Sequence, residues 1–332
     1  MLGTLRLILA LAVALSHADF RIAGLNPGVI AVTGFYLVSG YVMTGLLQRH
    51  YPDARHAGGF YLDRGLRLMP QYLFYLLLAL VWFLADLSPA PAASQAYFLS
   101  RMPDAVDLLN NLAVIPLNYF MWNGADRYTL IPPAWSLGAE MQFYLLAPFV
   151  LLWPRRLLGL GLLGFGVYLL AVFGQVNSDW FGYRLLPGVL TFFLLGALLR
   201  HLHQHTRHRA ALALVAAVVL LSLLIGALAR AHGSLNQPYN QETLLGLILI
   251  FPLLHGLARR PRRGWDEHAG DLSYGLFLNH FLILWVVFPA GVSVAQLPLF
   301  LLLGLLLAFV SQRYVERPVL ALRKKLRRAD GR

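Results

Sequence analysis

Ten long apolar runs, separated by short polar segments, constrain the fold of this chain more than any other feature. Each run approaches the roughly 17 to 25 apolar residues that an α-helix needs to cross a bilayer. Only helices and closed barrels satisfy their backbone hydrogen bonds in lipid, so the runs predict an all-α polytopic membrane protein. They cover residues 3–20, 28–47, 66–86, 135–153, 156–173, 184–202, 210–229, 241–258, 270–288 and 296–315.

The composition supports this fold class. Hydrophobic residues make up 58% of the 332 residues and charged residues only 13%, so a soluble globule would expose most of its apolar surface. No small-residue cleavage site follows the first run, which favours a retained helix over a removable signal peptide. The chain has no cysteine, which excludes disulfides and thiolate chemistry, and we expect no metal cofactor.

The basic residues indicate the orientation of the helices. If the N-terminus is cytoplasmic, 22 of the 27 lysines and arginines fall in inner segments, and the opposite topology would invert that ratio. We therefore predict that both termini are cytoplasmic and that the net charge of +12 reflects topology, with no nucleic-acid partner. The outward-facing basic residues are then Arg21, Arg101, Arg127, Arg184 and Arg230.

The longest connection, residues 87–134, lies outside in this topology. Its moderately apolar piece, Leu108 to Trp122, is interrupted by three asparagines and a proline. We expect this piece to be re-entrant or to lie on the membrane surface, where it would roof a cavity. The chain then divides into a transmembrane domain, residues 1–316, and a basic cytoplasmic tail, residues 317–332.

Arg6 and His17 stand on one face of the first helix. They are eleven residues apart, which is about three turns or roughly 16 Å along the axis. Charged and titratable side chains are costly in lipid, so we expect both to face a polar interior. The alternative for His17 is an interfacial histidine at a helix end.

Glu140, in the fourth run, is the carboxylate placed most clearly inside a predicted span. It reaches a depth similar to that of His17, because the first helix runs outward and the fourth inward. We expect the two to pair, since a carboxylate would fix the histidine tautomer and raise its basicity for general-base chemistry. A purely structural Glu140 is the alternative. The sequence neighbours that would complete the pocket are Trp135, Ser136 and Tyr144.

Arg64 and Arg67 lie at the cytoplasmic mouth of the third helix. Their i, i+3 spacing puts both guanidinium groups on one face, where they suit multidentate phosphate binding. An ordinary positive-inside cap is the alternative. Glu316, at the end of the tenth run, is a candidate ion-pair partner for either arginine.

Two further runs contain hydroxyl and imidazole groups. Ser39 lies among small residues typical of close helix packing, and its functional interpretation is that it lines a path beside His17. Ser273 and His280, in the ninth run, are seven residues apart and share a face. A buried neutral histidine that donates to a carbonyl is the alternative for His280.

In their order, these motifs resemble the membrane-bound acyltransferase family 3. The resemblance implies ten helices and transfer of an acyl group, commonly acetyl, from acyl-coenzyme A (acyl-CoA) to a hydroxyl of a surface polysaccharide, lipopolysaccharide or related glycan. At Ser16, before the histidine, the family commonly has an aromatic residue. The motifs are Arg6 with His17, FYLVSGY, DRGLRLMPQY, WSLGAEMQFYLLAP, SYGLFLNH and YVERP.

The resemblance also implies roles for these residues. We expect His17 and Glu140 to be catalytic, and a hydroxyl such as that of Ser39 to stabilise the oxyanion. The donor would bind Arg6 and the RxxR pair. The family positions fall, in chain order, on Arg6, His17, Arg64, Arg67, Glu140, Ser273, Tyr274 and His280.

A secondary transporter is the main alternative. It would also have ten helices with a buried histidine and glutamate, but it should show inverted repeats, which we do not find. A non-catalytic scaffold would have no reason to combine the RxxR pair with these two residues. We therefore predict a multi-pass enzyme of the cell inner membrane whose partners are membrane lipid and a glycan acceptor.

Reporter fusions test the predicted orientation. Fusions at Arg262 and Arg328 should report a cytoplasmic position, and a fusion near Arg127 an external one, because basic segments stay inside. Paired phosphatase and fluorescent-protein reporters measure this. An external Arg262 would contradict the charge argument and the sidedness of every candidate site.

Overall fold

The computed structural model describes residues 1–85, 93–261 and 263–321. Within these ranges every regular element is a helix. Eight helices are long and apolar enough, by length and composition, to cross a membrane. The prediction of an all-α polytopic membrane protein is therefore confirmed. Arg262 and most of the predicted tail, from residue 322 on, lie outside the described residues.

Each of the ten predicted runs corresponds to one long helix. These helices are α1 (Leu2–His17), α2 (Pro27–His50), α3 (Ala57–Leu84), α7 (Ala134–Val150), α8 (Pro154–Val172), α9 (Leu186–Gln204), α10 (His208–His232), α11 (Asn240–Ala258), α12 (Gly264–Val287) and α13 (Leu297–Ser311). Two of the ten, α1 with 16 residues and α7 with 17, are not among the eight candidate spans, whereas α13, with 15 residues, is part of the longer span Val294–Ala321.

Short helices and turns occupy the connections. The polar piece from Leu108 to Trp122 is not one helix, because Val114 ends α5 with a positive φ of 65° and a 3-10 helix follows it. The short elements are η1 (Ala54–His56), α4 (Ala93–Phe98), α5 (Ala105–Ala113), η2 (Ile115–Tyr119), α6 (Phe120–Asn123), η3 (Ala125–Arg127), the π turn η4 (Trp180–Arg184), η5 (Val294–Gln296) and the π turn η6 (Gln312–Glu316).

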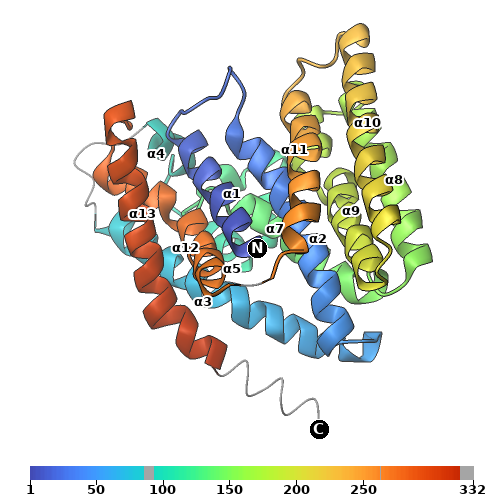
Figure 1. Cartoon of the computed structure of the whole chain (residues 1–332). Coiled ribbons are helices and arrows are strands. Elements are labelled where there is room, and N and C mark those ends of the chain that lie inside the picture. Colours follow the sequence, from blue (N-terminus) through green and yellow to red (C-terminus); the bar gives the residue numbers. More distant parts are fainter. Residues whose placement is uncertain (86–92, 262, 322–332) are drawn as a thin grey trace.

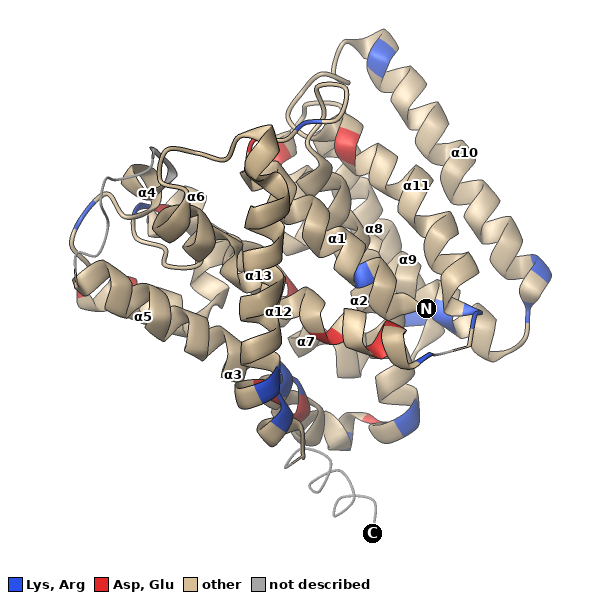
Figure 2. Cartoon of the chain, turned by 60° about the vertical axis from the view of Figure 1, so that its left-hand side comes forward, with Lys and Arg blue, Asp and Glu red and all other residues tan. Residues whose placement is uncertain are grey.

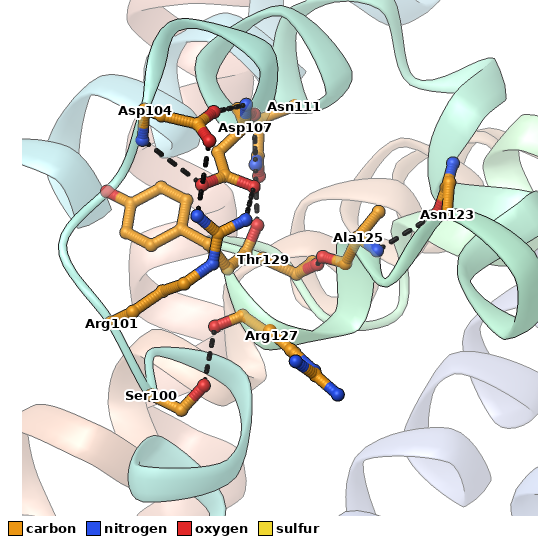
Figure 3. A network of polar contacts seen from close by, with 10 residues as sticks. Ser100, Arg101, Asp104, Asp107, Asn111, Asn123, Ala125, Arg127 and Thr129 are labelled. Carbon is orange, nitrogen blue, oxygen red and sulfur yellow. Dashed lines mark hydrogen bonds and ion pairs between the residues drawn. The ribbon is translucent and has the colours of Figure 1, made fainter.

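A polar network fixes the start of α5 (Figure 3). Asp104 and Asp107 form a capping box in which each carboxylate accepts from the backbone N–H of the other, at 2.8 and 3.1 Å. Arg101 donates to both carboxylates, at 3.2 and 2.9 Å. The Asp107 backbone N–H, followed by the Arg101 side chain, holds the pKa of the Asp104 carboxyl below its usual range. Asn111 ties α5 to the carbonyl of Tyr128, so this outer connection is anchored.

Helix α2 passes through the middle of the bundle, with α1, α9 and α11 packed against it (Figure 1). It approaches α9 most closely at two glycines. A Cβ at Gly40 would overlap the carbonyl oxygen of Phe193, and a Cβ at Gly196 would overlap that of Leu37. The small residues of α2 therefore do serve close helix packing, as their pattern indicates.

Helices α1 and α12 run parallel and touch near the start and near the end of α1. The backbone N–H and the hydroxyl of Thr4 both donate to Oδ1 of Asp266, at 2.8 Å each. Gly3 allows this approach, because a Cβ there would overlap the Asp266 carbonyl. At the end of α1, the ring of His17 lies against that of His280, seven residues before the end of α12. The parallel arrangement is what alternating spans require of a first and a ninth helix.

The helix shafts are largely uncharged, and the charged residues gather at helix ends and in connections (Figure 2). We call the end of the bundle where α1, α3 and α12 begin the Arg64 end. We call the opposite end, where α1 and α12 finish, the His17 end. The predicted topology would make the Arg64 end cytoplasmic.

The glycine contacts between α2 and α9 predict a loss of stability on substitution. Gly40→Ala or Gly196→Ala should lower the free energy of unfolding by on the order of 1–3 kcal/mol, because the new methyl group meets backbone that cannot move alone. Thermal unfolding in detergent measures the effect. The matched control is Gly166→Ala in α8, where an added Cβ meets nothing within 4 Å. Equal unfolding temperatures for all three variants would contradict the close packing.

Candidate active site

A cavity of about 390 Å³ opens at the Arg64 end and follows α2 into the bundle. Of the predicted site residues, the cavity brings together those expected to bind the donor with several of the pocket residues. Those that line it are Arg6, Ser39, Arg64, Arg67, Ser136, Glu140, Tyr144, Ser273 and Tyr274. Trp135, His17 and His280 do not line it.

Five arginines line this larger cavity, against one carboxylate, Glu140, among the described lining residues. Arg67 experiences repulsion from both Arg6 and Arg64. Positive charge concentrated in a partly enclosed site favours an anionic ligand. The five arginines come from four helices and are Arg6, Arg49, Arg64, Arg67 and Arg200.

Two of these arginines have carboxylate partners. Arg64 pairs with its sequence neighbour Asp63, and Arg67 pairs with Glu316. The predicted ion pair of Glu316 is therefore confirmed, with Arg67 as the partner. The π turn η6 carries Glu316 to this position, and π turns are frequent at functional sites. Arg67 also lies over the ring of Tyr274, at 5.7 Å.

Glu140 lies in the interior wall of the larger cavity. Its Oε1 accepts hydrogen bonds from the hydroxyls of Ser39 and Tyr144, both at 2.6 Å. A serine hydroxyl has a single O–H to donate, and that of Ser39 is already directed at Glu140. The expected role of Ser39 as an oxyanion donor therefore does not fit the geometry.

A second cavity, of about 70 Å³, lies at the His17 end. His17 and Trp135 line it, and Ser136 lines both cavities together with Val32 and Phe277. The two cavities therefore meet at these three residues. Helix α2 lines both, so one helix connects the arginine-rich mouth with the surroundings of His17.

His17 pairs with His280, and the predicted pairing with Glu140 is wrong. His17 Nδ1 lies 3.0 Å from His280 Nε2, and the rings stack with centroids 5.0 Å apart. The physical reason is the parallel packing of α1 on α12, which puts the two imidazoles at the same level. Glu140 reaches a similar depth on another helix but finds its partners on α2 and α7.

The hydrogen bonds of His280 indicate the tautomer of His17. His280 Nδ1 lies 3.2 Å from the carbonyl oxygen of Leu276, so in a neutral ring this nitrogen carries the proton and donates. Nε2 of His280 then accepts from Nδ1–H of His17. Nε2 of His17 is left with a lone pair, which is the form that a general base requires. His17 is an exposed residue at the end of α1, whereas His280 is fully buried.

The remaining predicted hydroxyl residues bond to nearby backbone. The hydroxyl of Ser136 donates to the carbonyl of Pro133 at 3.0 Å, and that of Ser273 to Gly270 at 2.7 Å. Tyr274 donates across to the carbonyl of Leu68 at 3.0 Å, which joins α12 to α3. Both serines therefore offer the larger cavity only acceptor lone pairs. Ser16 packs on Gly28 so closely that an aromatic residue would not fit there.

Sequence reasoning treated three further lining arginines, Arg49, Arg184 and Arg200, only as markers of topology. Arg200 is four residues after Gly196, so it shares the face of α9 that packs on α2. This sequence spacing is the signal that could have predicted its position. Its guanidinium lies 5.5 Å from the ring centre of Tyr41. Arg184 lines the smaller cavity because of the π turn η4, which no sequence pattern revealed.

These features agree with comparisons against known proteins. Residues 2–311 match the acyltransferase domain family that the motif order resembles, and the chain belongs to this family. A protein of Aquifex aeolicus (strain VF5), named only as uncharacterized, is 37% identical over 158 residues, 47% of this chain and 72% of that protein. No solved structure matches the chain.

Two relatives in Staphylococcus aureus have informative names. "Putative O-acetyltransferase" of strain COL is 22% identical over 362 aligned positions, 96% of this chain and 56% of that protein. "O-acetyltransferase OatA" of strain NCTC 8325 is 27% identical over 161 positions, 45% of this chain and 24% of that protein. This chain thus spans little more than half the length of the first. Together, the family and these names support an acyltransferase enzyme.

Proposed function

We propose that the protein transfers an acyl group, most simply acetyl, from acyl-CoA to a hydroxyl of a cell-surface glycan. The observation that carries this proposal is the pair of cavities that meet along α2, with arginines at one mouth and His17 at the other. The S. aureus relatives are named for O-acetyl transfer, which supports an oxygen acceptor.

The donor enters from the Arg64 end in this proposal. Its phosphates are held by Arg64, Arg67 and Arg6, since guanidinium groups bind phosphate through parallel hydrogen bonds. From Arg49 to Val29 the lining of α2 extends over twenty residues, or about 30 Å, which matches the hydrocarbon thickness of a bilayer. A long, thin pantetheine arm fits such a path, and its thioester would reach the junction of the cavities.

Glu140 contributes to the donor path in this scheme. Its carboxylate, held by Ser39 and Tyr144, faces the larger cavity, where pantetheine amide N–H groups need acceptors. Glu140 then positions the donor and does not orient the base. The orienting group for the base is His280.

His17 is the general base for the acceptor hydroxyl. Its Nε2 removes the hydroxyl proton as the oxygen attacks the thioester carbonyl, a contribution of roughly 10² to 10⁴ in rate. The tetrahedral intermediate then expels the CoA thiolate as the carbon–sulfur bond breaks. The thiolate takes the proton back from His17, so the products are the O-acyl ester and free CoA thiol, and the histidine is regenerated.

The acceptor reaches His17 from the opposite side of the membrane. His17 is an exposed residue at the end of α1, and it lines the smaller cavity, apart from the five arginines of the larger one. With the predicted topology, donor and acceptor remain on the cytoplasmic and external sides. The enzyme would then modify envelope glycans from the cell inner membrane, with lipid around its exposed leucines.

Substitution of Arg67 tests donor binding. Arg67→Ala should weaken acetyl-CoA binding by about 1.5–3 kcal/mol, the value of a hydrogen bond to a charged group. Arg67→Lys should restore little, because an ammonium group cannot reproduce the guanidinium fork. Isothermal titration of the purified protein measures both. Arg156→Gln is the control, because Arg156 lies over Trp153 outside the cavities. Unchanged affinity in both Arg67 variants would make this arginine a structural partner of Glu316 only.

Substitution of the two histidines tests the base and its orienting partner. His17→Ala should lower turnover by about 10² to 10⁴, and His280→Ala should lower it because the tautomer of His17 is no longer fixed. The double variant should lose little more than His17→Ala, because groups that act as a unit are not additive. Transfer of labelled acetyl to envelope glycans measures turnover.

Donor binding and unfolding temperature serve as readouts of intact structure in these variants. His232→Ala is the matched control, because this histidine contacts Phe173 and lines neither cavity. Wild-type turnover by His17→Ala, or fully additive losses in the double variant, would contradict the proposed unit.

A further inference from the structure

Arg184 lies at the His17 end within a group of aromatic rings. Its guanidinium carbon is 4.5 Å from the ring centre of Trp135, 5.2 Å from those of Phe120 and Tyr183, and 5.7 Å from that of Tyr239. Its side chain is only 15% exposed. Stacking on several rings stabilises a partly buried cation and fixes the plane of its fork.

Most of the hydrogen-bonding capacity of Arg184 is unused. Its Nε donates to Asp179 at 2.6 Å, and no other described residue accepts a hydrogen bond from the guanidinium. The side chain lines the smaller cavity together with His17. A guanidinium has five N–H donors, so the terminal amino groups remain available to a ligand that enters beside His17.

The backbone around Arg184 is held in an unusual conformation. Arg184 ends the π turn η4, and Leu185 is extended before α9 begins. The side chain of Asn118, from η2 in the outer connection, donates to the carbonyl of Arg184 at 3.1 Å. Single π turns are frequent at functional sites. This π turn directs the guanidinium of Arg184 inward, whereas the end of a regular helix would leave it in solvent.

We propose that the smaller cavity is the acceptor subsite and that it takes a saccharide ring, with Arg184 donating to ring oxygens beside the reacting hydroxyl. This inference rests on the proposed function. A sugar ring has apolar C–H faces that pack on aromatic side chains and a rim of oxygens that accept from a guanidinium fork. Trp135 and Tyr239 supply the aromatic surface for the C–H face. Arg184 supplies the hydrogen-bond donors, and His17 is the base.

The volume of the smaller cavity limits the size of the ligand that can enter it. A volume of about 70 Å³ accommodates the hydroxyl-bearing edge of one ring and not an oligosaccharide. Outside it lies Trp122, 58% exposed, with its ring 5.9 Å from Tyr119 and 5.8 Å from Trp180. These rings offer a surface for the next sugar, so the subsite fits the reacting residue of a longer chain.

Saccharide binding in the absence of donor tests the subsite. Chitotriose, maltotriose and cellotriose are titrated against the purified full-length protein, with intrinsic tryptophan fluorescence and saturation-transfer NMR as readouts. We expect at least one trisaccharide to bind. Arg184→Gln and Trp135→Leu should each weaken that binding by about tenfold, the loss of one charge-assisted hydrogen bond or one stacked ring. Arg184→Lys should rescue little.

The chain offers a matched control at the other end of the bundle. Arg156 lies 4.7 Å over the ring of Trp153, so Arg156→Gln and Trp153→Leu remove a similar pair outside both cavities and should leave saccharide binding unchanged. No binding by the wild type, or equal binding by all folded variants, would overturn the subsite. Unfolding temperature identifies variants that fail to fold, and Arg184→Lys keeps the charge if Arg184→Gln is one of them.

Acetyl-CoA titration distinguishes this inference from the proposed function. Arg184→Gln should bind acetyl-CoA as the wild type does, and Arg67→Ala should bind the trisaccharide as the wild type does. Saccharide binding without any acetyl-CoA binding would refute the proposed donor and leave the subsite supported. Donor binding and transfer with no effect of Arg184 on the KM for the saccharide would refute the subsite alone.

Discussion

The close approach of α2 to α9 is the contact on which the rest of the site depends. Gly40 and Gly196 each let a helix backbone lie against a carbonyl of its neighbour. With α9 packed this tightly, Arg200 reaches the ring of Tyr41 on α2 and so lines the larger cavity. Helix α2 also lines both cavities, which share lining residues inside an apolar bundle. Lipid cannot form hydrogen bonds with polar side chains, so these side chains lie in the interior of the bundle.

The charge of the larger cavity argues for the kind of ligand that it receives. Carboxylates neutralise Arg64 and Arg67, but Arg6, Arg49 and Arg200 form no ion pair with a described residue. Cations held together at the edge of a bilayer repel one another and lose hydration, and a bound polyanion relieves both costs. A neutral or singly charged substrate would relieve little. This imbalance favours a multiply phosphorylated donor over a small neutral solute.

The sequence predicted the helices and the levels of the site residues but not their neighbours. Hydropathy is a local property, so all ten runs correspond to helices, and residues at one membrane level, such as Arg67 and Glu316, could be matched. The depth of a residue in the membrane does not determine which faces of two helices contact each other. His17 therefore lies against His280 at the parallel contact of α1 with α12, and it does not pair with Glu140. Arg184 was missed for a different reason, because a π turn changes the direction of a side chain without a composition signal.

The junction of the two cavities addresses a problem that an exposed base creates. His17 is an exposed residue at the end of α1, so water competes with the glycan hydroxyl for the proposed base. A thioester held next to that water would be hydrolysed. The larger cavity and the smaller one that holds His17, however, share only Val32, Ser136 and Phe277 among their described lining residues, and two of these three are apolar. In the proposed mechanism the thioester meets the base only at this junction, where a bound sugar edge displaces the water. The junction, more than the strength of the base, would then decide between transfer and hydrolysis.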